Sequence, residues 1–356
     1  MNNRPYYQQV DIANTQKLRD MISELPSFAA TFFRGIEPTT SSRTRIAYAY
    51  DLKVFFHYLC ERAEGFQGRS ITDIQLLDLD TITPIQLEMY MEYLKYYVNE
   101  DAEEDHINKE RGISRKMSCL KTFYNYFYKK ELLANNPAAL VTLPKIREKE
   151  IIRLDIDEVA KLLDVVEDGG TLTAHQQAFH EKTKVRDLAM LTLLLGTGIR
   201  VSECVGLDIT DVDFRNAGIK VHRKGGKEVV VYFGDEVEEA LQDYLMERKQ
   251  ILAESGHENA LFLSLQNKRI SVRAVENLVK KYASQITGVK KITPHKLRST
   301  YGTSLYRETG DIYLVADVLG HSDVNTTRKH YAAQEDERRR SARNKVQLRE
   351  KRWTSE

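Results

Sequence analysis

Residues 310–331, GDIYLVADVLGHSDVNTTRKHY, hold the pattern on which the predicted fold and chemistry both depend. The stretch predicts two short helices, near 311–319 and 323–331, with Gly320 and His321 between them. Taken alone, a His after Gly320 is typical of a helix cap or a turn. Tyr331 at a helix end is, by itself, typical of a half-buried packing residue. The meaning of both residues therefore depends on the rest of the chain.

Three segments further upstream carry basic side chains that could act together with this stretch. Arg200 lies in GTGIRVSE, Lys224 in the RKGGKE turn, and His295 and Arg298 in TPHKLRST. Each piece is weak evidence, because a His-x-x-Arg spacing occurs by chance on many helices and the chain is rich in lysine. The order and spacing of the whole set carry the argument.

In order and spacing, these pieces resemble the tyrosine recombinase and integrase family. The family pattern is Arg, a hairpin Lys, His-x-x-Arg, a His or Trp after Leu-Gly, and finally Tyr. Every position is filled here, by Arg200, Lys224, His295, Arg298, His321 and Tyr331. The resemblance is strong over residues 185–332 and extends to the Xer branch, especially the single Xer recombinase of streptococci and lactococci. One departure is Ser299, where many relatives carry a second basic residue or a His.

The chemistry of a phosphodiester explains why such residues would converge. In-line displacement spreads negative charge over the phosphate oxygens, so the site needs fixed positive donors. Arg200 and Arg298 suit a clamp on the non-bridging oxygens, because a guanidinium stays protonated and presents a planar fork. The resemblance implies Tyr331 as the nucleophile of a 3′-phosphotyrosine intermediate and Lys224 as the general acid for the leaving 5′ oxygen.

The resemblance also implies His295 as a proton acceptor or transition-state donor, and His321 as one further hydrogen bond to the phosphate. Glu203 follows Arg200 by three residues, so on a helix its carboxylate would hold the guanidinium; an ordinary surface acid is the alternative. We expect no cofactor and no metal, because the phosphotyrosine keeps the bond energy and the chain lacks both a GxxxxGK[ST] loop and a metal-ligand cluster.

Composition places the chain among ordinary globular proteins with room for two domains. It has 356 residues, of which 42% are hydrophobic and 29% charged, and its net charge of +1 does not by itself indicate nucleic acid. Three scattered cysteines, Cys60, Cys119 and Cys204, are expected to be small core residues. The longest nearly apolar stretch, 188–199, is too short to span a membrane. A cytoplasmic protein with no membrane partner is expected.

The predicted fold is mainly α and has two domains. An N-terminal helical core-binding, SAM-like DNA-binding domain is expected over 1–146, a linker over 147–154, and a catalytic domain with a C-terminal tail over 155–356. IKVH and VVVYF flank the Gly-Gly turn, which predicts a β-hairpin, and the rest of the second half is predicted to be helical. The resemblance implies that the two domains form a C-shaped clamp on DNA.

In the first half, apolar spacing predicts helices over 40–62, from Thr83-Pro84 through Tyr97, and from Ser114 onward, with an acidic loop over 99–110. Basic residues on two of these helices are candidates for contacts with the phosphate backbone, and a solvated helix face explains them equally well. These candidates are Arg43, Arg45, Lys53, Arg115, Lys116 and Lys121.

The Xer resemblance implies a double-stranded DNA partner with inverted half-sites, a homotetramer that forms a Holliday junction, and resolution of chromosome dimers at a dif-like site with an FtsK-type translocase. A mobile-element integrase is one alternative, but the roughly forty residues before the first clear helix look too short for the arm-binding domain that such enzymes often carry. A non-cleaving DNA-binding protein would not need the intact catalytic set. The resemblance of the tail argues against a type IB topoisomerase.

Overall fold

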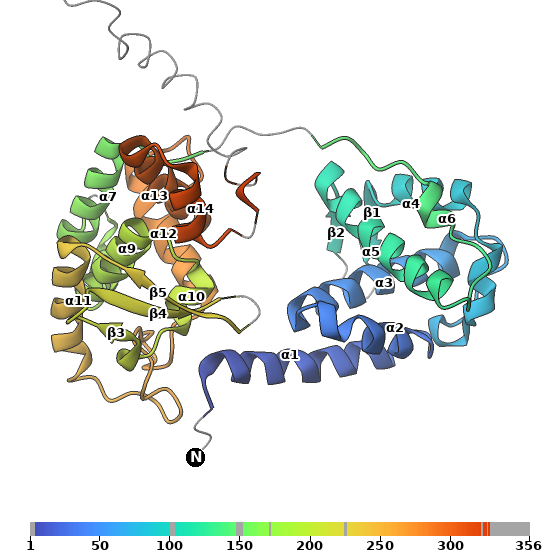
Figure 1. Cartoon of the computed structure of the whole chain (residues 1–356), viewed down its shortest axis with the longest axis horizontal. Coiled ribbons are helices and arrows are strands. Elements are labelled where there is room, and N and C mark those ends of the chain that lie inside the picture. Colours follow the sequence, from blue (N-terminus) through green and yellow to red (C-terminus); the bar gives the residue numbers. More distant parts are fainter. Residues whose placement is uncertain are drawn as a thin grey trace, which may run out of the picture. The chain divides into compact units, whose positions relative to one another are not determined.

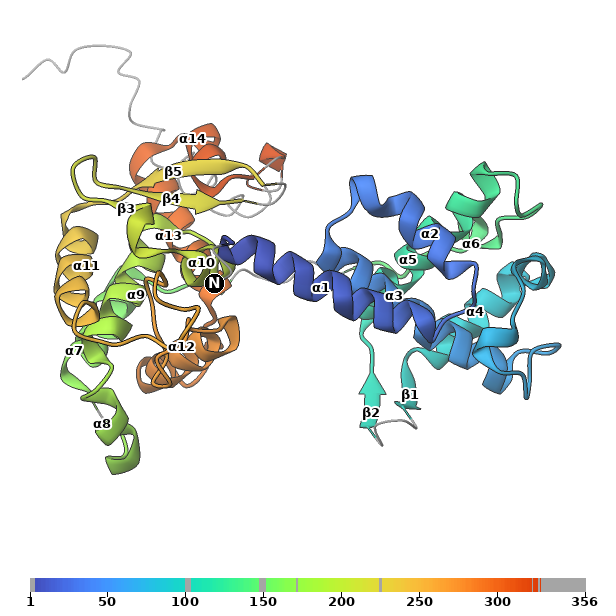
Figure 2. The same cartoon turned by 90° about the horizontal axis from the view of Figure 1, so that it is seen from below.

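The computed structural model describes residues 4–99, 104–146, 152–170, 172–223, 226–321, 323–325 and 327. The chain divides into two compact units, Asn3–Lys149 and Glu150–Glu356 (Figures 1 and 2). Both units are mainly helical, as the sequence predicts, and each contains a small antiparallel sheet, which the sequence predicts only for the second unit. Within the described part of the chain, every helix is too short or too polar to cross a bilayer.

The N-terminal unit is built from helices and one hairpin. Its helices are α1 (Tyr6–Ser23), α2 (Ala29–Ile36), α3 (Ser42–Arg62), α4 (Pro84–Tyr93), α5 (Glu110–Lys129) and α6 (Pro137–Leu140), and its 3-10 helices are η1 (Glu37–Thr39), η2 (Ile71–Asp73) and η3 (Leu76–Thr81). Strands β1 (Tyr96–Asn99) and β2 (Glu104–Ile107) pair antiparallel. Figure 2 shows this hairpin extending from the helical part of its unit.

Aromatic side chains form much of the core of this unit. Phe32, Phe56, Phe123 and Phe127 are fully buried, and the rings of Phe32 and Phe123 meet edge to face with their centroids 5.1 Å apart. Such edge-to-face pairs stabilise a core beyond the area that they bury. The helices that carry these rings, α2, α3 and α5, are thereby held together.

Three expectations for the first half are wrong. The helix expected to run through Tyr97 ends at Tyr93, and strand β1 begins at Tyr96. Helices α1 and α2 precede Thr40, where the sequence predicts none; α1 packs against α3 but fully buries only Leu18, so it carries little apolar periodicity. The expected acidic loop contains strand β2, whose partner β1 buries Tyr97 against His106, with the two rings stacked 5.1 Å apart. The cross-strand pairing therefore overrides the polar composition.

The C-terminal unit combines helices with a three-stranded sheet. Its helices are α7 (Ile156–Asp168), α8 (Ala174–His180), α9 (Lys184–Thr197), α10 (Val201–Gly206), α11 (Asp235–Arg248), α12 (Val272–Ile286), α13 (Pro294–Thr309) and α14 (Ile312–Leu319), with the 3-10 helix η4 (Ile209–Asp211). The strands β3 (Val212–Asp213), β4 (Gly218–His222) and β5 (Glu228–Tyr232) pair antiparallel in that order. The predicted hairpin, β4–β5, is confirmed.

Helix α9 is the central element of this unit. Met190, Leu191, Leu193 and Leu194 are all buried, as is typical of a helix covered on most of its circumference. Helices α7, α11 and α13 all pack against it (Figure 1). Because α9 is held on several sides, the segment that follows its C-terminal end begins at a fixed position in the unit.

Candidate active site

The two arginines that are predicted to bind the scissile phosphate meet at one turn of the C-terminal unit. Arg200 donates a hydrogen bond from Nη2 to the carbonyl oxygen of Gly320, at 3.2 Å. Arg298 donates from Nη2 to the carbonyl oxygen of Leu319, the preceding residue, and from Nη1 to that of Gly198, at 2.5 Å. The two guanidinium groups are more than ninety residues apart in sequence, yet they bind adjacent carbonyls at the end of α14.

Arg200 is placed by the way in which α9 ends. Gly198 caps α9 in the left-handed region at φ 62°, and a Cβ atom there would lie 2.4 Å from Cδ1 of Tyr301. Glycine thus meets both the backbone and the packing demands of this turn. Arg200 follows as the N-cap of α10.

Glu203 holds Arg200 at two points. Its carboxylate accepts hydrogen bonds from the backbone N–H and from Nη1 of Arg200, both at 2.8 Å. The side chain of Glu203 is 3% exposed, whereas that of Arg200 is 39% exposed. The carboxylate is therefore a buried anchor, and part of the guanidinium remains within reach of an anion from solvent.

Helix α13 carries the His-x-x-Arg pair. It begins at Pro294, so His295 lies exposed in its first turn and Arg298 follows, buried, one turn later. The hydroxyl of Thr300 accepts a hydrogen bond from the backbone N–H of Leu154, at 3.0 Å, which fixes α13 against the start of the unit. The helix thus offers a buried guanidinium and an exposed imidazole on neighbouring turns.

His321 follows the glycine that ends α14. Gly320 has a φ of 62°, and the backbone N–H of His321 donates to the carbonyl oxygen of Ala316, at 2.9 Å, which closes the helix. Nδ1 of His321 and the hydroxyl of the buried Thr327 are 2.7 Å apart and share a hydrogen bond. His321 therefore serves as a turn residue, and its ring is also held in a fixed orientation.

A third guanidinium, that of Arg223, reaches the same turn and was not singled out from the sequence. It donates from Nη2 to the carbonyl oxygen of Val318, at 2.7 Å, and from Nη1 to that of Asp317, at 3.4 Å. The carbonyl end of a helix carries unpaired acceptors and partial negative charge, which favour bound cations. The only sequence signal was an Arg directly before Lys224 in the hairpin.

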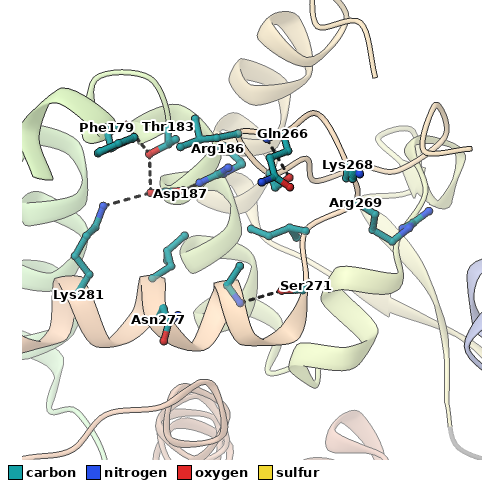
Figure 3. Close-up of a pocket in the computed structure, with 15 residues that line it drawn as sticks. Phe179, Thr183, Arg186, Asp187, Gln266, Lys268, Arg269, Ser271, Asn277 and Lys281 are labelled. Atoms are coloured by element: carbon teal, nitrogen blue, oxygen red, sulfur yellow. Dashed lines mark hydrogen bonds and ion pairs between the residues drawn. The ribbon is translucent and has the colours of Figure 1, made fainter. Parts of the chain in front are cut away.

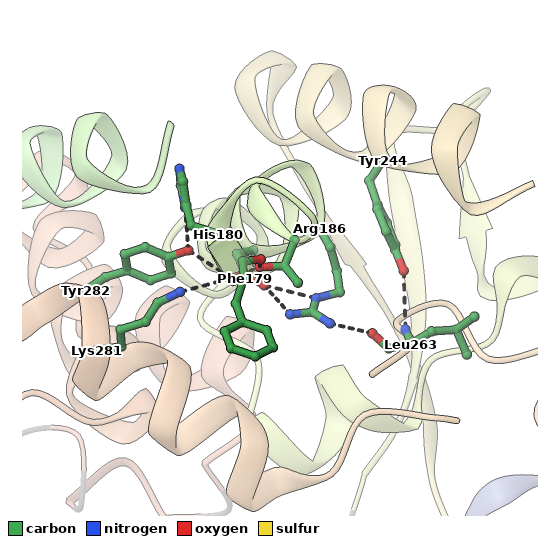
Figure 4. Close-up of polar contacts among 9 residues, drawn as sticks. Phe179, His180, Arg186, Tyr244, Leu263, Lys281 and Tyr282 are labelled. Atoms are coloured by element: carbon green, nitrogen blue, oxygen red, sulfur yellow. Dashed lines mark hydrogen bonds and ion pairs between the residues drawn. The ribbon is translucent and has the colours of Figure 1, made fainter. Parts of the chain in front are cut away.

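A cavity of about 590 Å³ lies elsewhere in the same unit, between the α8–α9 region, residues 264–271 and α12 (Figure 3). Its described lining includes none of the predicted catalytic residues. At its wall, the buried carboxylate of Asp187 accepts hydrogen bonds from Arg186 at 2.6 and 3.0 Å and from Tyr282 at 2.9 Å (Figure 4). Burial raises the pKa of Tyr282, so the phenol keeps the proton that it donates. This network ties α9 to α12.

The predicted DNA contacts of the N-terminal unit divide into two groups. Arg45 is buried and pairs with Glu37 at 2.5 Å, and Lys116 is buried beside Asp51, with Nζ and Oδ1 3.4 Å apart. Both side chains are largely removed from solvent and paired with carboxylates, so we do not carry them forward as phosphate contacts. The sequence could not reveal this, because the acidic partners follow only from the packing.

The remaining basic candidates are more accessible. Arg115 is exposed, although it binds both carboxylate oxygens of Asp51, at 2.5 and 2.6 Å. Lys53 pairs with Glu24, and Lys121 donates to the carbonyl oxygen of Val141, at 2.8 Å. Arg43 is exposed on the first turn of α3. These four residues stay predicted DNA contacts.

Two predicted catalytic residues, Lys224 and Tyr331, lie outside the described residues. Within the described ranges, no group of three or more His, Cys, Asp or Glu side chains could hold a metal ion. Cys119 and Cys204 are free and buried, and Cys60 is free and partly buried, in keeping with their expected place in the cores.

Comparison with known proteins adds independent evidence. Residues 152–338 match the phage integrase family. The chain is 35% identical over 316 residues to the tyrosine recombinase XerC of Caldanaerobacter subterraneus subsp. tengcongensis. This alignment covers 86% of this chain and 82% of that protein. It is 30% identical to the tyrosine recombinase XerD of Staphylococcus epidermidis, over 83% of this chain and 89% of that one.

Solved structures share the fold at lower sequence identity. A XerH site-specific recombinase bound to a palindromic difH substrate has a TM-score of 0.65 at 18% identity, covering 96% of this chain and 90% of that one. A lambda integrase dimer bound to a COC′ core site has a TM-score of 0.58 at 15% identity, covering 84% and 95%. Fold, family match and full-length relatives agree: the chain belongs to the phage integrase family, as a site-specific tyrosine recombinase of the Xer branch.

Proposed function

We propose that this recombinase cleaves DNA with Tyr331 as its nucleophile. The phenol oxygen attacks the scissile phosphorus, the bond to the 5′ oxygen breaks, and a 3′-phosphotyrosine forms. Lys224 gives the proton that the departing 5′ oxygen takes up, and His295 accepts the proton of the phenol or donates to the transition state. Attack by another 5′ hydroxyl reverses these steps, so strands are rejoined without ATP.

The convergence of Arg200 and Arg298 on one turn carries this proposal. The two guanidinium groups are held by the carbonyls of Gly320 and Leu319. Donors that are already oriented stabilise developing charge without a cost of reorganisation in the transition state. A phosphate beside this turn would lie near Arg200 and near His321, the residue that follows Gly320.

The biological substrate follows from the Xer relationship. We propose that the protein acts in the cytoplasm on double-stranded DNA with inverted half-sites, as a homotetramer that passes through a Holliday junction. Its task would be to resolve chromosome dimers at a dif-like site before cell division, with an FtsK-type translocase as partner. Relatives named XerC and XerD, which match most of the chain, support this assignment, and the C-shaped clamp on DNA remains part of the proposal.

A mobile-element integrase is the alternative within the family. A transposon Tn1549 integrase shares the fold, with a TM-score of 0.60 at 19% identity, but fold alone does not separate the two roles. Helices α1 and α2 occupy most of the residues before Thr40, and α1 packs against α3, so this segment does not favour the integrase reading. The XerC and XerD relatives therefore carry the preference for a chromosomal role.

The decisive experiment traps the covalent intermediate. The native protein and Tyr331→Phe are incubated with DNA that is nicked close to the cleavage position, so that the released 5′ end diffuses away and rejoining fails. We expect a protein–DNA adduct that survives denaturation for the native protein and none for Tyr331→Phe, because a phenylalanine ring has no oxygen to attack phosphorus.

Tyr313→Phe is the matched control, because Tyr313 is an exposed tyrosine on α14 and has no proposed role. It should form the adduct at the native rate, and both variants should bind DNA as the native protein does in a gel-shift assay. An adduct formed by Tyr331→Phe would move the nucleophile to another residue. Absence of an adduct from the native protein on every candidate site, despite DNA binding, would support the non-cleaving alternative.

A further inference from the structure

Arg223 makes backbone hydrogen bonds within the hairpin, and its guanidinium group reaches the end of α14. Strand β4 ends at His222, and the next residue donates its backbone N–H to the carbonyl oxygen of Lys227, at 2.8 Å. The carbonyl oxygen of Arg223 accepts from the backbone N–H of Gly226, at 3.2 Å, which closes a tight turn. Its guanidinium group binds the carbonyls of Asp317 and Val318 at the end of α14.

The packing beside Gly320 shows how closely this guanidinium group fits. A Cβ atom at Gly320 would lie 2.1 Å from Nη1 of Arg223, and Gly320 also has a φ of 62°. Any other residue at 320 would both strain the backbone and displace the guanidinium group. The glycine between Leu319 and His321 therefore makes room for Arg223 as well as ending the helix.

Four successive carbonyls at this turn are occupied by arginines from three different parts of the unit. Those of Asp317 and Val318 bind Arg223, that of Leu319 binds Arg298, and that of Gly320 binds Arg200. Movement of Arg223 would therefore disturb the same short segment on which the two proposed phosphate-binding arginines depend. The hairpin and the phosphate clamp share one support.

The environment of Arg223 argues against an ordinary surface role. Its Nε atom is buried and has no hydrogen-bond partner among the described residues. A buried donor without an acceptor lowers stability, so this position is poorly explained by stability alone. The cost is easier to understand if the geometry of the site dictates where the guanidinium group lies.

We propose that Arg223 is a positioning residue for the cleavage step, acting through its neighbour Lys224. The covalent chain joins Lys224 directly to Arg223, and Arg223 is fastened to the α14 end that precedes His321. Loss of these contacts would release the residue that precedes Lys224 in the chain from the segment that binds Arg200 and Arg298. This inference rests on the proposed function, because it assumes that Lys224 protonates the leaving oxygen.

The test compares two leaving groups. Native protein, Arg223→Ala, Arg223→Lys and Lys224→Ala are mixed in excess with nicked DNA that carries either the normal 5′ oxygen or a bridging sulfur at the scissile phosphate. A thiolate leaves without protonation, so the sulfur substrate does not need the acid. We expect Arg223→Ala to slow adduct formation about 10- to 100-fold on the oxygen substrate, part of the roughly 10²–10⁴-fold that a general acid contributes.

On the sulfur substrate, Arg223→Ala should react within about threefold of the native rate, as Lys224→Ala should, if both act through leaving-group protonation. Arg223→Lys should recover part of the rate on oxygen, because an ammonium group can still donate to one carbonyl. Arg215→Ala, which removes an exposed arginine before β4, is the matched control and should behave as the native protein does. DNA affinity should be unchanged in all variants.

Each other outcome overturns a defined statement. Equal slowing of Arg223→Ala on both substrates, with Lys224→Ala rescued by sulfur, would remove the positioning role and leave the proposed function intact. A native rate for Arg223→Ala on oxygen would do the same. If sulfur fails to rescue Lys224→Ala, Lys224 is not the general acid, and both the proposed role of Lys224 and this inference fall. Thermal melting curves of Arg223→Ala and Arg223→Lys would identify a folding defect. If Arg223→Ala alone is destabilised, the rates of Arg223→Lys on the two substrates decide the question.

Discussion

Glu203 shows at the scale of one residue how a buried carboxylate holds an arginine of the proposed active site. It accepts two hydrogen bonds from Arg200, one from the backbone and one from the guanidinium group. In Glu203→Gln, one of the two oxygens becomes a donor and the negative charge is lost, so the charged hydrogen bond weakens. A hydrogen bond to a charged group contributes about 1.5–3 kcal/mol, which predicts adduct formation slower by about 10- to 100-fold.

Single-turnover measurements on the nicked substrate would test the Glu203→Gln prediction, with Glu276→Gln as the control. Glu276 also pairs with an arginine three residues away, Arg273, but on the surface of α12. Exposed pairs of this kind contribute little, so the control should react at the native rate. Equal rates for Glu203→Gln and the native protein would show that Arg200 holds its position without the carboxylate.

His180 illustrates the scale of secondary-structure elements, because it joins α8 to α12. Its Nδ1 lies 3.0 Å from the hydroxyl of Tyr282, which in turn donates to Asp187 on α9 (Figure 4). Burial, assisted by the nearby Lys281, lowers the pKa of His180 from its ordinary value of 6.5. The folded state therefore binds a proton less readily than the unfolded chain does.

From this shift we predict that the free energy of unfolding falls as the pH drops through 6.5 toward the lowered pKa of His180. The slope cannot exceed about 1.4 kcal/mol per pH unit for one group. Urea unfolding at pH 7.5 and pH 5.5 would show a smaller pH effect for His180→Gln than for the native protein. His175→Gln, on the exposed side of the same helix, is the control and should keep the native pH effect.

DNA binding belongs to the scale of the whole molecule, because the net charge of +1 conceals how the basic residues are placed. Each phosphate contact releases counterions and steepens the fall of affinity with salt by about 0.9 in the log–log slope. We predict that Arg43→Ala weakens binding and flattens the slope by about that amount. Arg62→Ala removes an arginine that is paired with Glu61 at 2.7 Å, and it serves as the control.

Titration of a labelled duplex at several salt concentrations would measure both slopes. A slope for Arg43→Ala equal to that of the native protein would remove Arg43 from the set of DNA contacts. Lys116→Ala is not a suitable probe, because it would leave Asp51 with one partner fewer in the core. Loss of a partner from a buried ion pair typically costs about 3–5 kcal/mol of stability, which would obscure any effect on DNA.

Periodicity and turn chemistry were enough to predict the strongly patterned elements. Alternating apolar residues around a Gly-Gly turn predicted β4 and β5, and Gly320 ends α14 where the sequence places the break between two helices. Helix α1 and strand β2 could not be predicted in this way. The first buries too little apolar surface to show a period, and the second depends on a partner strand.

The sequence by itself determined the chemistry, because the order of Arg, Lys, His-x-x-Arg, His and Tyr limits which reaction this recombinase could perform. Only the tertiary structure showed which of the cationic candidates are buried against acidic partners and which remain accessible. Arg45 and Lys116 were indistinguishable from surface residues until their acidic partners, Glu37 and Asp51, were seen beside them. Arg223 likewise gained its place at the site only through the carbonyl end of α14, because hydrogen bonds between distant segments have no signature in local sequence.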